Sequence, residues 1–267
     1  MASLFQKFNI CFAGSSNVER TLLLAHGYGC DQNIWRLVLE HFPEFKIVLF
    51  DHVGSGRSNE RAYDFDKYAT LHGYADDVLA ICNELKLQRV CFVGHSVSAM
   101  IGLLAAVKKP DCFEQLVMVG PSPCYINDGD YIGGFNKSDI MAMMEALENN
   151  FMGWTSTITP VIMRNEDRPE LTAELANSFC RMNPAIAKHF ARTTFLSDNR
   201  NDLPKLKVPT LVVQCQEDAI APPQVGEYVV RSIGSHCSMA LLNTVGHCPH
   251  VSAPGMTAAA IRKFLQV

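Results

Sequence analysis

One stretch limits what this chain can fold into more than any other, an apolar strand that passes through a tight turn into a helix. It covers residues 89–102 and reads Arg-Val-Cys-Phe-Val-Gly-His-Ser-Val-Ser-Ala-Met-Ile-Gly. Ser96 stands at the turn, with Gly94 two positions before it and Ser98 two positions after it. This is close to the G-x-S-x-G elbow, in which a sharp turn lifts a serine hydroxyl above a parallel sheet. Ser98 departs from the strict pattern by one hydroxymethyl group.

The rest of the chain alternates strands and helices, as a parallel sheet requires. Apolar runs predict strands at residues 3–12, 20–25, 46–50, 90–93, 115–119, 210–214 and 238–242. Helical periodicity appears between most of them, for example over residues 69–85 and 222–232. This order predicts an α/β fold with a mostly parallel sheet and helices on both faces.

The strands stop between residues 124 and 202, where helical patterns replace them. Four helices are expected there, one marked by Ile140, Met143, Met144 and Leu147 and three over residues 151–163, 170–181 and 185–197. Most apolar side chains of this segment must pack helix against core, but a cap over a pocket also needs apolar residues facing inward. We therefore predict a core of residues 1–123 and 203–267 and a helical cap, or lid, of residues 124–202.

The composition indicates one globular domain with an insertion. Of 267 residues, 48% are hydrophobic and 19% are charged, which suffices for a substantial core. The formal net charge of −4 provides no basic surface for nucleic acid or for a membrane. The first ten residues contain no signal-peptide core, and no apolar run approaches the roughly 18 residues of a membrane span. Ten cysteines without a C-x-x-C pair favour reduced thiols and a cytoplasmic location.

Two later loops supply the partners that a serine nucleophile needs. A serine requires a base within hydrogen-bond reach, and the base requires an orienting acid. In elbow folds the acid and then the histidine follow the serine along the chain. Asp218 follows the strand at 210–214, and His247 follows the strand at 238–242. We predict Ser96 as nucleophile, His247 as general base and then acid, and Asp218 as the residue that orients the imidazole.

Each of these assignments has an alternative nearby. Glu217 precedes Asp218, which is also placed to cap the next helix, and His250 follows three residues after His247. The two histidines would also suit a metal, but no third ligand stands at a suitable spacing, so we expect no metal and no cofactor. His95, next to the nucleophile, is expected to support the turn or line the pocket.

Two backbone N–H groups are predicted to form an oxyanion hole. One belongs to Val97, the residue after the nucleophile, where the N-terminus of the helix adds a favourable field. The other is assigned to Tyr28, in the loop after the strand at 20–25. The sequence His-Gly-Tyr-Gly at 26–29 provides glycines that let the backbone approach closely.

Several motifs along the chain together resemble one branch of the α/β-hydrolase superfamily. They are His26-Gly-x-Gly, Asp31-Gln-x-x-Trp35, the elbow up to Gly102, Ser122-Pro-x-Tyr-x-Asn-Asp128, Gly133-Gly-Phe135 and Gly246-His-x-Pro-His250. That branch contains the bacterial stress-response regulator RsbQ and the plant karrikin and strigolactone receptors. The motifs at residues 120–125, 179–180 and 247–250 are more similar to the bacterial regulator. The resemblance covers nearly the whole chain.

The resemblance implies a sheet of about eight strands, a cap of four helices and the triad derived above. It also implies a deep apolar pocket lined by Tyr28, Tyr125, Phe135, Met143, Trp154, Ile158, Val161, Thr194, Phe195 and Ala219, to which we add His95 from its place beside the nucleophile. Members of the branch hydrolyse small esters or butenolide lactones slowly and signal by binding a partner protein. Ile158 and Thr194 stand where the plant receptors carry larger or more apolar residues.

Two functions are therefore expected. The first is a serine hydrolase of small, mostly apolar esters or lactones. The second is a ligand sensor with slow or incidental hydrolysis, which signals to a regulatory protein partner through the cap. A third interpretation is a cofactor-free haloperoxidase or a carbon–carbon hydrolase on the same fold. A dehalogenase is disfavoured, because its nucleophile would be an aspartate where Ser96 stands.

Overall fold

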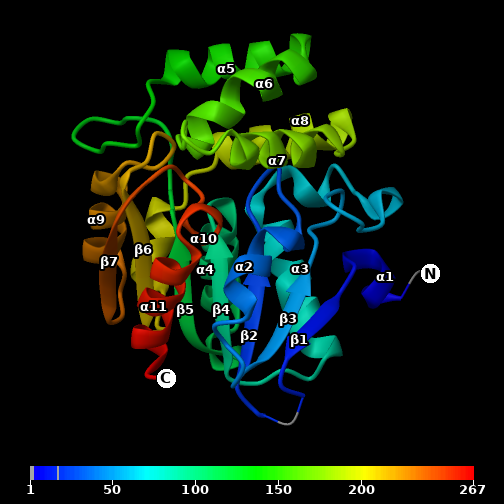
Figure 1. Cartoon of the computed structure of the whole chain (residues 1–267), viewed down its shortest axis with the longest axis vertical. Coiled ribbons are helices and arrows are strands. Elements are labelled where there is room, and N and C mark those ends of the chain that lie inside the picture. The colour runs from blue at the N-terminus through cyan, green and yellow to red at the C-terminus, as the bar shows by residue number, and fades with distance from the viewer. Residues whose placement is uncertain (1–2, 17) are drawn as a thin grey trace.

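A single seven-stranded sheet forms the centre of the molecule (Figure 1). The computed structural model describes residues 3–16 and 18–267. The strands are β1 (Cys11–Gly14), β2 (Thr21–Ala25), β3 (Lys46–Phe50), β4 (Val90–His95), β5 (Phe113–Val119), β6 (Thr210–Glu217) and β7 (Cys237–Val245). Their spatial order is β1-β3-β2-β4-β5-β6-β7, and only the pairing of β1 with β3 is antiparallel. The predicted mostly parallel sheet is confirmed.

Helices cover both faces of the sheet and one of its ends. The α-helices are α1 (Leu4–Phe8), α2 (Arg36–Leu39), α3 (Leu71–Glu84), α4 (Val97–Lys108), α5 (Lys137–Asn149), α6 (Phe151–Met163), α7 (Pro169–Cys180), α8 (Pro184–Phe195), α9 (Pro223–Ser232), α10 (Pro249–Ser252) and α11 (Pro254–Leu265). Short 3-10 helices are η1 (Gln32–Trp35), η2 (Glu60–Ala62), η3 (Lys67–Ala69), η4 (Pro110–Cys112) and η5 (Arg200–Lys205). Within the part of the chain that the structure describes, no helix is both long and apolar enough to cross a membrane.

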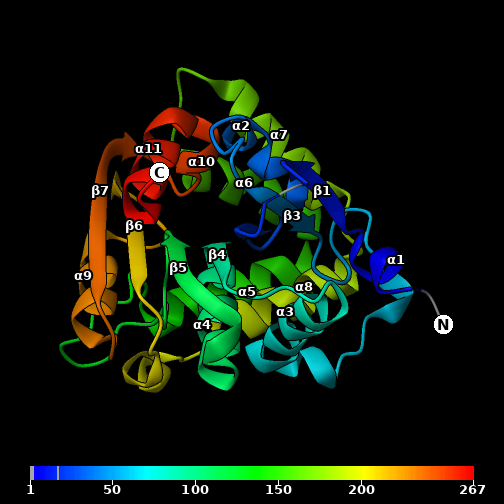
Figure 2. The ribbon, with the colours of Figure 1, turned by 90° about the horizontal axis from the view of Figure 1, so that it is seen from below.

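The two faces of the sheet belong to two separate apolar clusters. Successive side chains of a strand point to opposite faces. Accordingly, Leu22 and Leu24 of β2 pack with α2 and α11, whereas Leu23 packs with α3 and α4. Figure 2 shows these helix pairs on opposite sides of the strands. The completely buried β2 is therefore apolar at every position after Thr21, as the sequence predicts for a central strand.

Helices α5, α6, α7 and α8, here called the cap helices, lie together above the carboxyl ends of the strands (Figure 1). Three of their aromatic side chains, Trp154, Phe179 and Phe190, belong to the same apolar cluster as α3 and α4. The cap helices therefore share a continuous core with one face of the sheet.

The first expected strand, residues 3–12, is wrong over most of its length. Residues Leu4–Phe8 form helix α1, and β1 begins only at Cys11. The cause is a local capping box in which the Ser3 side chain accepts from the Gln6 N–H and the Gln6 side chain accepts from the Ser3 N–H, each at 3.3 Å. The described residues form seven strands rather than the eight that the resemblance implies.

Candidate active site

Ser96 lies at a strained junction between β4 and α4. Its backbone has φ 56° and ψ −122°, a conformation that residues with a side chain rarely adopt. The turn leaves no room at Gly94, because a Cβ there would meet the backbone of Ser98 and lie 2.8 Å from the Ala99 nitrogen. The sharp turn and the close passage of strand and helix therefore explain why Gly94 precedes the serine.

The structure brings the three residues of the predicted triad together. The Ser96 Oγ lies 2.8 Å from the Nε2 of His247, and the Nδ1 of His247 lies 2.7 Å from the Oδ2 of Asp218. All three side chains are buried. Because a carboxylate only accepts, the Nδ1 must carry the proton, which leaves Nε2 free to accept the proton of the serine hydroxyl.

Asp218 is held by its own loop. Its Oδ1 accepts from the N–H groups of Ile220 at 2.8 Å and Ala221 at 3.0 Å, so Oδ2 remains for His247. The neighbouring Glu217 is exposed and lies 3.4 Å from the guanidinium of Arg164. Of the two acids in this loop, only Asp218 contacts the imidazole.

Ser98, the departure from the strict elbow pattern, has a structural role. Its hydroxyl donates to the His26 carbonyl at 2.5 Å and lies 2.7 Å from the Nε2 of His52. Because the serine proton is directed to the carbonyl, His52 donates through Nε2. The His26 Nε2 in turn accepts from the His52 N–H at 3.1 Å. Burial lowers the pKa of both histidines, so this network is neutral. It ties the loop after β2 to α4.

The loop after β2 passes directly beside the nucleophile. A Cβ at Gly27 would lie 3.2 Å from the Ser96 Cβ and 2.6 Å from the His95 Nδ1, so only glycine fits. Val97 is the first residue of α4, where a helix leaves its N–H groups without intrahelical acceptors. The predicted oxyanion residues therefore lie on two segments that meet at the nucleophile, Val97 at the start of α4 and Tyr28 in the loop that passes Ser96.

Two further histidines lie behind the imidazole of His247. The Nε2 of His95 donates to the His247 carbonyl at 2.9 Å, so His95 supports the loop. The ring of His250 lies 4.4 Å from that of His95 and 4.4 Å from that of Trp35. Burial, and then the nearby His247, lower the pKa of His250 to about 3. His250 is thus a neutral packing residue here, rather than a partner of Ser96.

The loop that carries His247 is bonded to the cap helices as well as to the sheet. The His247 N–H donates to the carbonyl of Ile162 on α6 at 2.8 Å. The Asn165 side chain, just after α6, donates to the Val245 carbonyl at 3.4 Å. Arg168 donates to the Ser252 carbonyl at 2.8 Å and pairs with the Asn165 side chain. The end of α6 and the turn between α6 and α7 therefore hold the histidine loop on both sides of the imidazole.

A cavity of about 30 Å³ adjoins Ser96 and His247. Five residues predicted for the pocket line it: Tyr28, His95, Tyr125, Thr194 and Phe195. Five lining residues were not predicted: Cys30, Ile162, Leu175, Ile220 and Cys248. The wall is mostly apolar and includes no lysine or arginine among the described residues.

The structure does not place the other six predicted residues on this wall. Phe135, Met143, Trp154 and Ile158 pack into or against the main apolar cluster, Ala219 is half-buried, and Val161 is 42% exposed. On α6 the neighbour Ile162 lines the cavity, because consecutive residues of a helix point about 100° apart. The spacing of apolar residues alone does not determine which face of a helix points into a pocket. No signal in the sequence singled out Cys30 or Cys248 among ten cysteines.

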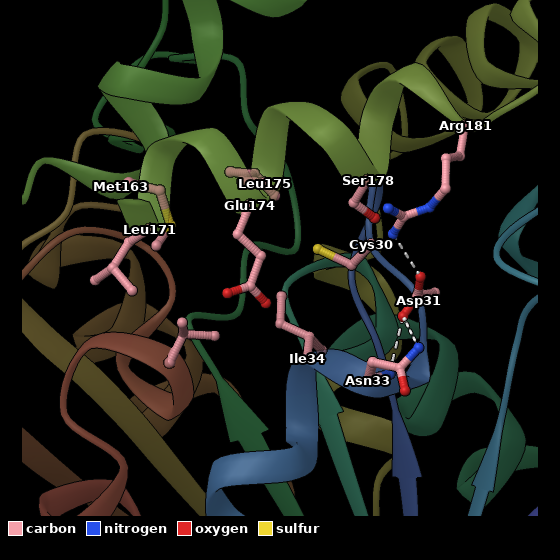
Figure 3. Close-up of a pocket in the computed structure, with 11 residues that line it drawn as sticks. Cys30, Asp31, Asn33, Ile34, Met163, Leu171, Glu174, Leu175, Ser178 and Arg181 are labelled. Carbon is pink, nitrogen blue, oxygen red and sulfur yellow. Dashed lines mark hydrogen bonds and ion pairs between the residues drawn. The ribbon is translucent and has the colours of Figure 1, made fainter. Parts of the chain in front are cut away.

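A second pocket lies behind the cavity wall, between η1 and α7 (Figure 3). Cys30 and Leu175 line both spaces and so separate them. Beside this pocket, the carboxylate of Asp31 accepts from Arg181 at 3.0 Å and from Asn33 at 2.9 Å. The loop after β2 is therefore also linked to α7.

The comparisons with known proteins agree with this geometry. A family model described as the alpha/beta hydrolase family matches residues 22–260. A karrikin insensitive 2 receptor (CA) of Petunia hybrida is 36% identical over 266 residues, 99% of this chain and 98% of that protein. The strigolactone esterase RMS3 of Pisum sativum is 37% identical over 96% of this chain and 95% of that protein.

A solved structure supports the same assignment. A hydrolase from Oleispira antarctica, olei00960, superimposes with a TM-score of 0.95 at 37% identity, covering 98% of this chain and 96% of that one. The resemblance to the karrikin and strigolactone receptors is confirmed by the plant relatives. The family match spans the elbow, the acid loop and the histidine loop. The chain belongs to the alpha/beta hydrolase family.

Proposed function

We propose that this protein is a serine hydrolase that cleaves small, uncharged and mostly apolar esters or lactones through an acyl-enzyme. The observation that carries the proposal is the unbroken pair of contacts from Ser96 to His247 and from His247 to Asp218, at 2.8 and 2.7 Å. The apolar cavity beside Ser96, with no lysine or arginine on its described wall, supports an uncharged substrate.

The reaction follows from the atoms in place. The Ser96 Oγ attacks the acyl carbon while the Nε2 of His247 takes its proton, and Asp218 stabilises the resulting imidazolium. The carbonyl oxygen becomes an oxyanion that accepts from the N–H groups of Val97 and Tyr28. The imidazolium then gives its proton to the leaving alkoxide, and an ester on Ser96 remains. Water, deprotonated by His247, attacks this ester; the bond to the Ser96 Oγ breaks, the imidazolium returns the proton to that oxygen, and the acid is released. In a lactone the alcohol and the acid stay in one molecule.

The cap belongs to this proposal. Residues 124–202 would form a lid over the carboxyl edge of a core made of residues 1–123 and 203–267, and the lid would shield the reacting groups from bulk solvent while admitting the water that releases the acid. The protein would act in the cytoplasm, where its ten cysteines would remain thiols. All ten, which fall within the described ranges, carry free thiols in the structure.

Turnover of 4-nitrophenyl butyrate tests the proposal. Ser96→Ala should lower kcat by about 10⁴-fold or more, because it removes the nucleophile. Ser138→Ala, an exposed change on α5, is the matched control and should retain wild-type turnover. Equal turnover by the wild type and Ser96→Ala would refute the proposed chemistry.

A second function is a ligand sensor that signals to a regulatory protein, similar to RsbQ, with slow or incidental hydrolysis. The names of the plant relatives, which include a receptor, support it. So do the bonds from the end of α6 to the histidine loop, which give chemistry at Ser96 a path to the cap.

Hydrogen exchange distinguishes this second function. Acylation of Ser96 by a slowly released ester should change amide exchange at residues 161–168 in a sensor. The same ester added to Ser96→Ala should leave these amides unchanged. A cap whose exchange is identical before and after acylation would count against signalling through it.

A further inference from the structure

Three hydroxyl groups on the cavity wall have no hydrogen-bond partner apart from the catalytic serine, which lies beside one of them, Tyr125. They belong to Tyr28, Tyr125 and Thr194, whose exposed fractions are 9%, 1% and 1%. A buried hydroxyl without a partner costs about 1–3 kcal/mol. Such groups are rare in folded proteins, and three of them around one cavity are a reason to consider what would bind there.

Most other buried or half-buried hydroxyls of the described residues are bonded, although Ser55, which does not line this cavity, also lacks a partner. The phenol of Tyr68 donates to Asp77 at 2.6 Å, and that of Tyr131 donates to the Cys124 carbonyl at 2.6 Å. On α6, Thr155 donates to the carbonyl four residues earlier at 2.9 Å, the usual solution for threonine in a helix. Thr194 on α8 does not do this, although its neighbour Thr193 donates to the Tyr68 carbonyl at 2.9 Å.

The phenols are neutral and therefore available as donors. Burial raises the pKa of Tyr28 far above its ordinary value, and it raises the pKa of Tyr125 to about 12, against a smaller opposing effect of the nearby Ser96 hydroxyl. Tyr125 therefore lies beside the reacting serine. Tyr28 lies among aromatic rings of the cap helices, with its ring 6.3 Å from that of Trp154 and 6.2 Å from that of Phe195.

We infer that the substrate is an uncharged ester or lactone that carries at least one further oxygen atom, which accepts a hydrogen bond from Tyr28, Tyr125 or Thr194. This inference rests on the proposed hydrolase function and narrows its substrate class from plain alkyl esters to oxygen-bearing ones. The described wall holds no lysine, arginine, aspartate or glutamate, so it offers no permanently charged side chain for a salt bridge with a charged group. Tyr28, Tyr125 and Thr194 are thus the residues that determine the preference for oxygen-bearing esters.

Pairs of esters that differ by one oxygen test this directly. Methyl methoxyacetate and methyl butanoate have nearly the same shape, as do methyl 3-methoxypropanoate and methyl pentanoate, and the ether oxygen only accepts. Release of acid is followed in a pH-stat, and each kcat/KM is divided by the rate constant of hydroxide-catalysed hydrolysis of the same ester. In the wild type, the corrected preference for the methoxy ester should be about tenfold or more in at least one pair.

Isosteric variants identify the donor. Tyr28→Phe, Tyr125→Phe and Thr194→Val each remove one hydroxyl, and at least one of them should reduce the corrected preference to within twofold of unity. Thr193→Val is the matched control, because it removes an adjacent hydroxyl that is already bonded to the Tyr68 carbonyl. It should keep the wild-type preference. A wild-type preference within twofold of unity in both pairs, or three variants that all retain it, would overturn the inference.

The same esters separate this inference from the proposed function. A wild type that hydrolyses both members of each pair equally refutes the inference and leaves the hydrolase intact. If no ester is hydrolysed at all, the hydrolase proposal fails. The pairs are then compared by their dissociation constants for Ser96→Ala protein, measured by NMR, with Thr194→Val and Thr193→Val added to that background. Equal affinity within each pair would then overturn the inference.

Discussion

The nucleophile and the base of the candidate triad are held by different parts of the molecule. Ser96 is fixed by the sheet and α4, with the Ser98 network beneath it and no cap residue in that network. His247 is fixed partly by Asp218 and partly by α6, through the Ile162 carbonyl. The comparison indicates that movement of the cap would displace the base before it displaced the nucleophile.

The glycines near the nucleophile and the glycine next to the base also differ in what they contact. Gly94 and Gly27 are required by close contacts within the core. Gly246, next to the base, has φ 87°, and a Cβ there would meet the Met163 carbonyl at the end of α6. The glycine before His247 is therefore needed for contact with the cap, in addition to its left-handed backbone.

The largest effect is expected from a change at Asp218, the acid that contacts the base. Asp218→Asn keeps an acceptor for the Ile220 and Ala221 N–H groups but presents an amide N–H to His247, which reverses the tautomer. We expect kcat for 4-nitrophenyl butyrate to fall by about 10⁴-fold with the fold intact. Glu217→Gln, on the neighbouring exposed acid, should change kcat less than twofold. If Glu217→Gln has the larger effect, the acid is assigned to the wrong residue.

The next effect isolates the cap side. Arg168→Met removes the bond to the Ser252 carbonyl and the partner of Asn165, so the histidine loop loses a support and the base is less well positioned. We expect kcat to fall about 10- to 100-fold with little change in KM, measured with the same ester. Arg36→Met breaks the ion pair of Arg36 with Glu174, which joins the cap to the start of α2 without touching the histidine loop. It should have almost no effect on kcat, and equal losses in both variants would remove the special role of the α6 end.

The third effect isolates the core side. Ser98→Ala leaves the His26 carbonyl and the His52 imidazole without their partner. We expect a loss of about 1–3 kcal/mol in the free energy of unfolding, measured by urea denaturation with circular dichroism. Ser98→Gly restores the strict elbow pattern but not the hydroxyl, so it should be at least as unstable. A Ser98→Ala protein as stable as the wild type would show that the network does not support the elbow.

The smallest expected effect concerns the stability of the fold at low pH. It involves His250, which lies behind the base. The pKa of His250 is lowered to about 3 in the folded protein, whereas the ordinary value is about 6.5. Between these values the unfolded chain binds the additional proton, so the free energy of unfolding should fall as the pH decreases from about 6.5 towards 3. A single buried histidine contributes up to about 1.4 kcal/mol per pH unit in this window.

Urea unfolding at pH 7, 6 and 5 measures this slope. His250→Phe, which can still pack against Trp35, should have a slope shallower by about one proton. The exposed His236→Gln is the control. An unchanged slope in His250→Phe would mean that other groups account for the acid sensitivity.

Much of the fold, and the meeting of Ser96, Asp218 and His247, could be predicted from local patterns. The elbow, the buried apolar strands and the order of Ser96, Asp218 and His247 are properties of short segments and of their succession. Helix α1 was missed although its Ser3–Gln6 capping box is visible, because the apolar residues around it also suit a strand. The pocket wall was predicted less completely, because it depends on which face of each helix points into the cavity. On α6, for example, Val161 was predicted to line the cavity, but Ile162 does so.

The bonds between the cap and the histidine loop had no signature in the sequence. The Ile162 carbonyl and the His247 N–H are backbone groups, which every residue has. Asn165 and Arg168 read as ordinary polar residues of a turn between two helices. Their role depends on the place where α6 ends relative to the sheet, which no local pattern specifies.

The central claim is that His247 and Asp218 make Ser96 a nucleophile, and the rate and site of fluorophosphonate labelling test it most directly. Intact mass and peptide mapping should show one adduct, on Ser96, that forms readily in the wild type, about 10³-fold or more slowly in Asp218→Asn and not at all in Ser96→Ala. An adduct on another residue, or equal labelling rates in the wild type and Asp218→Asn, would contradict it.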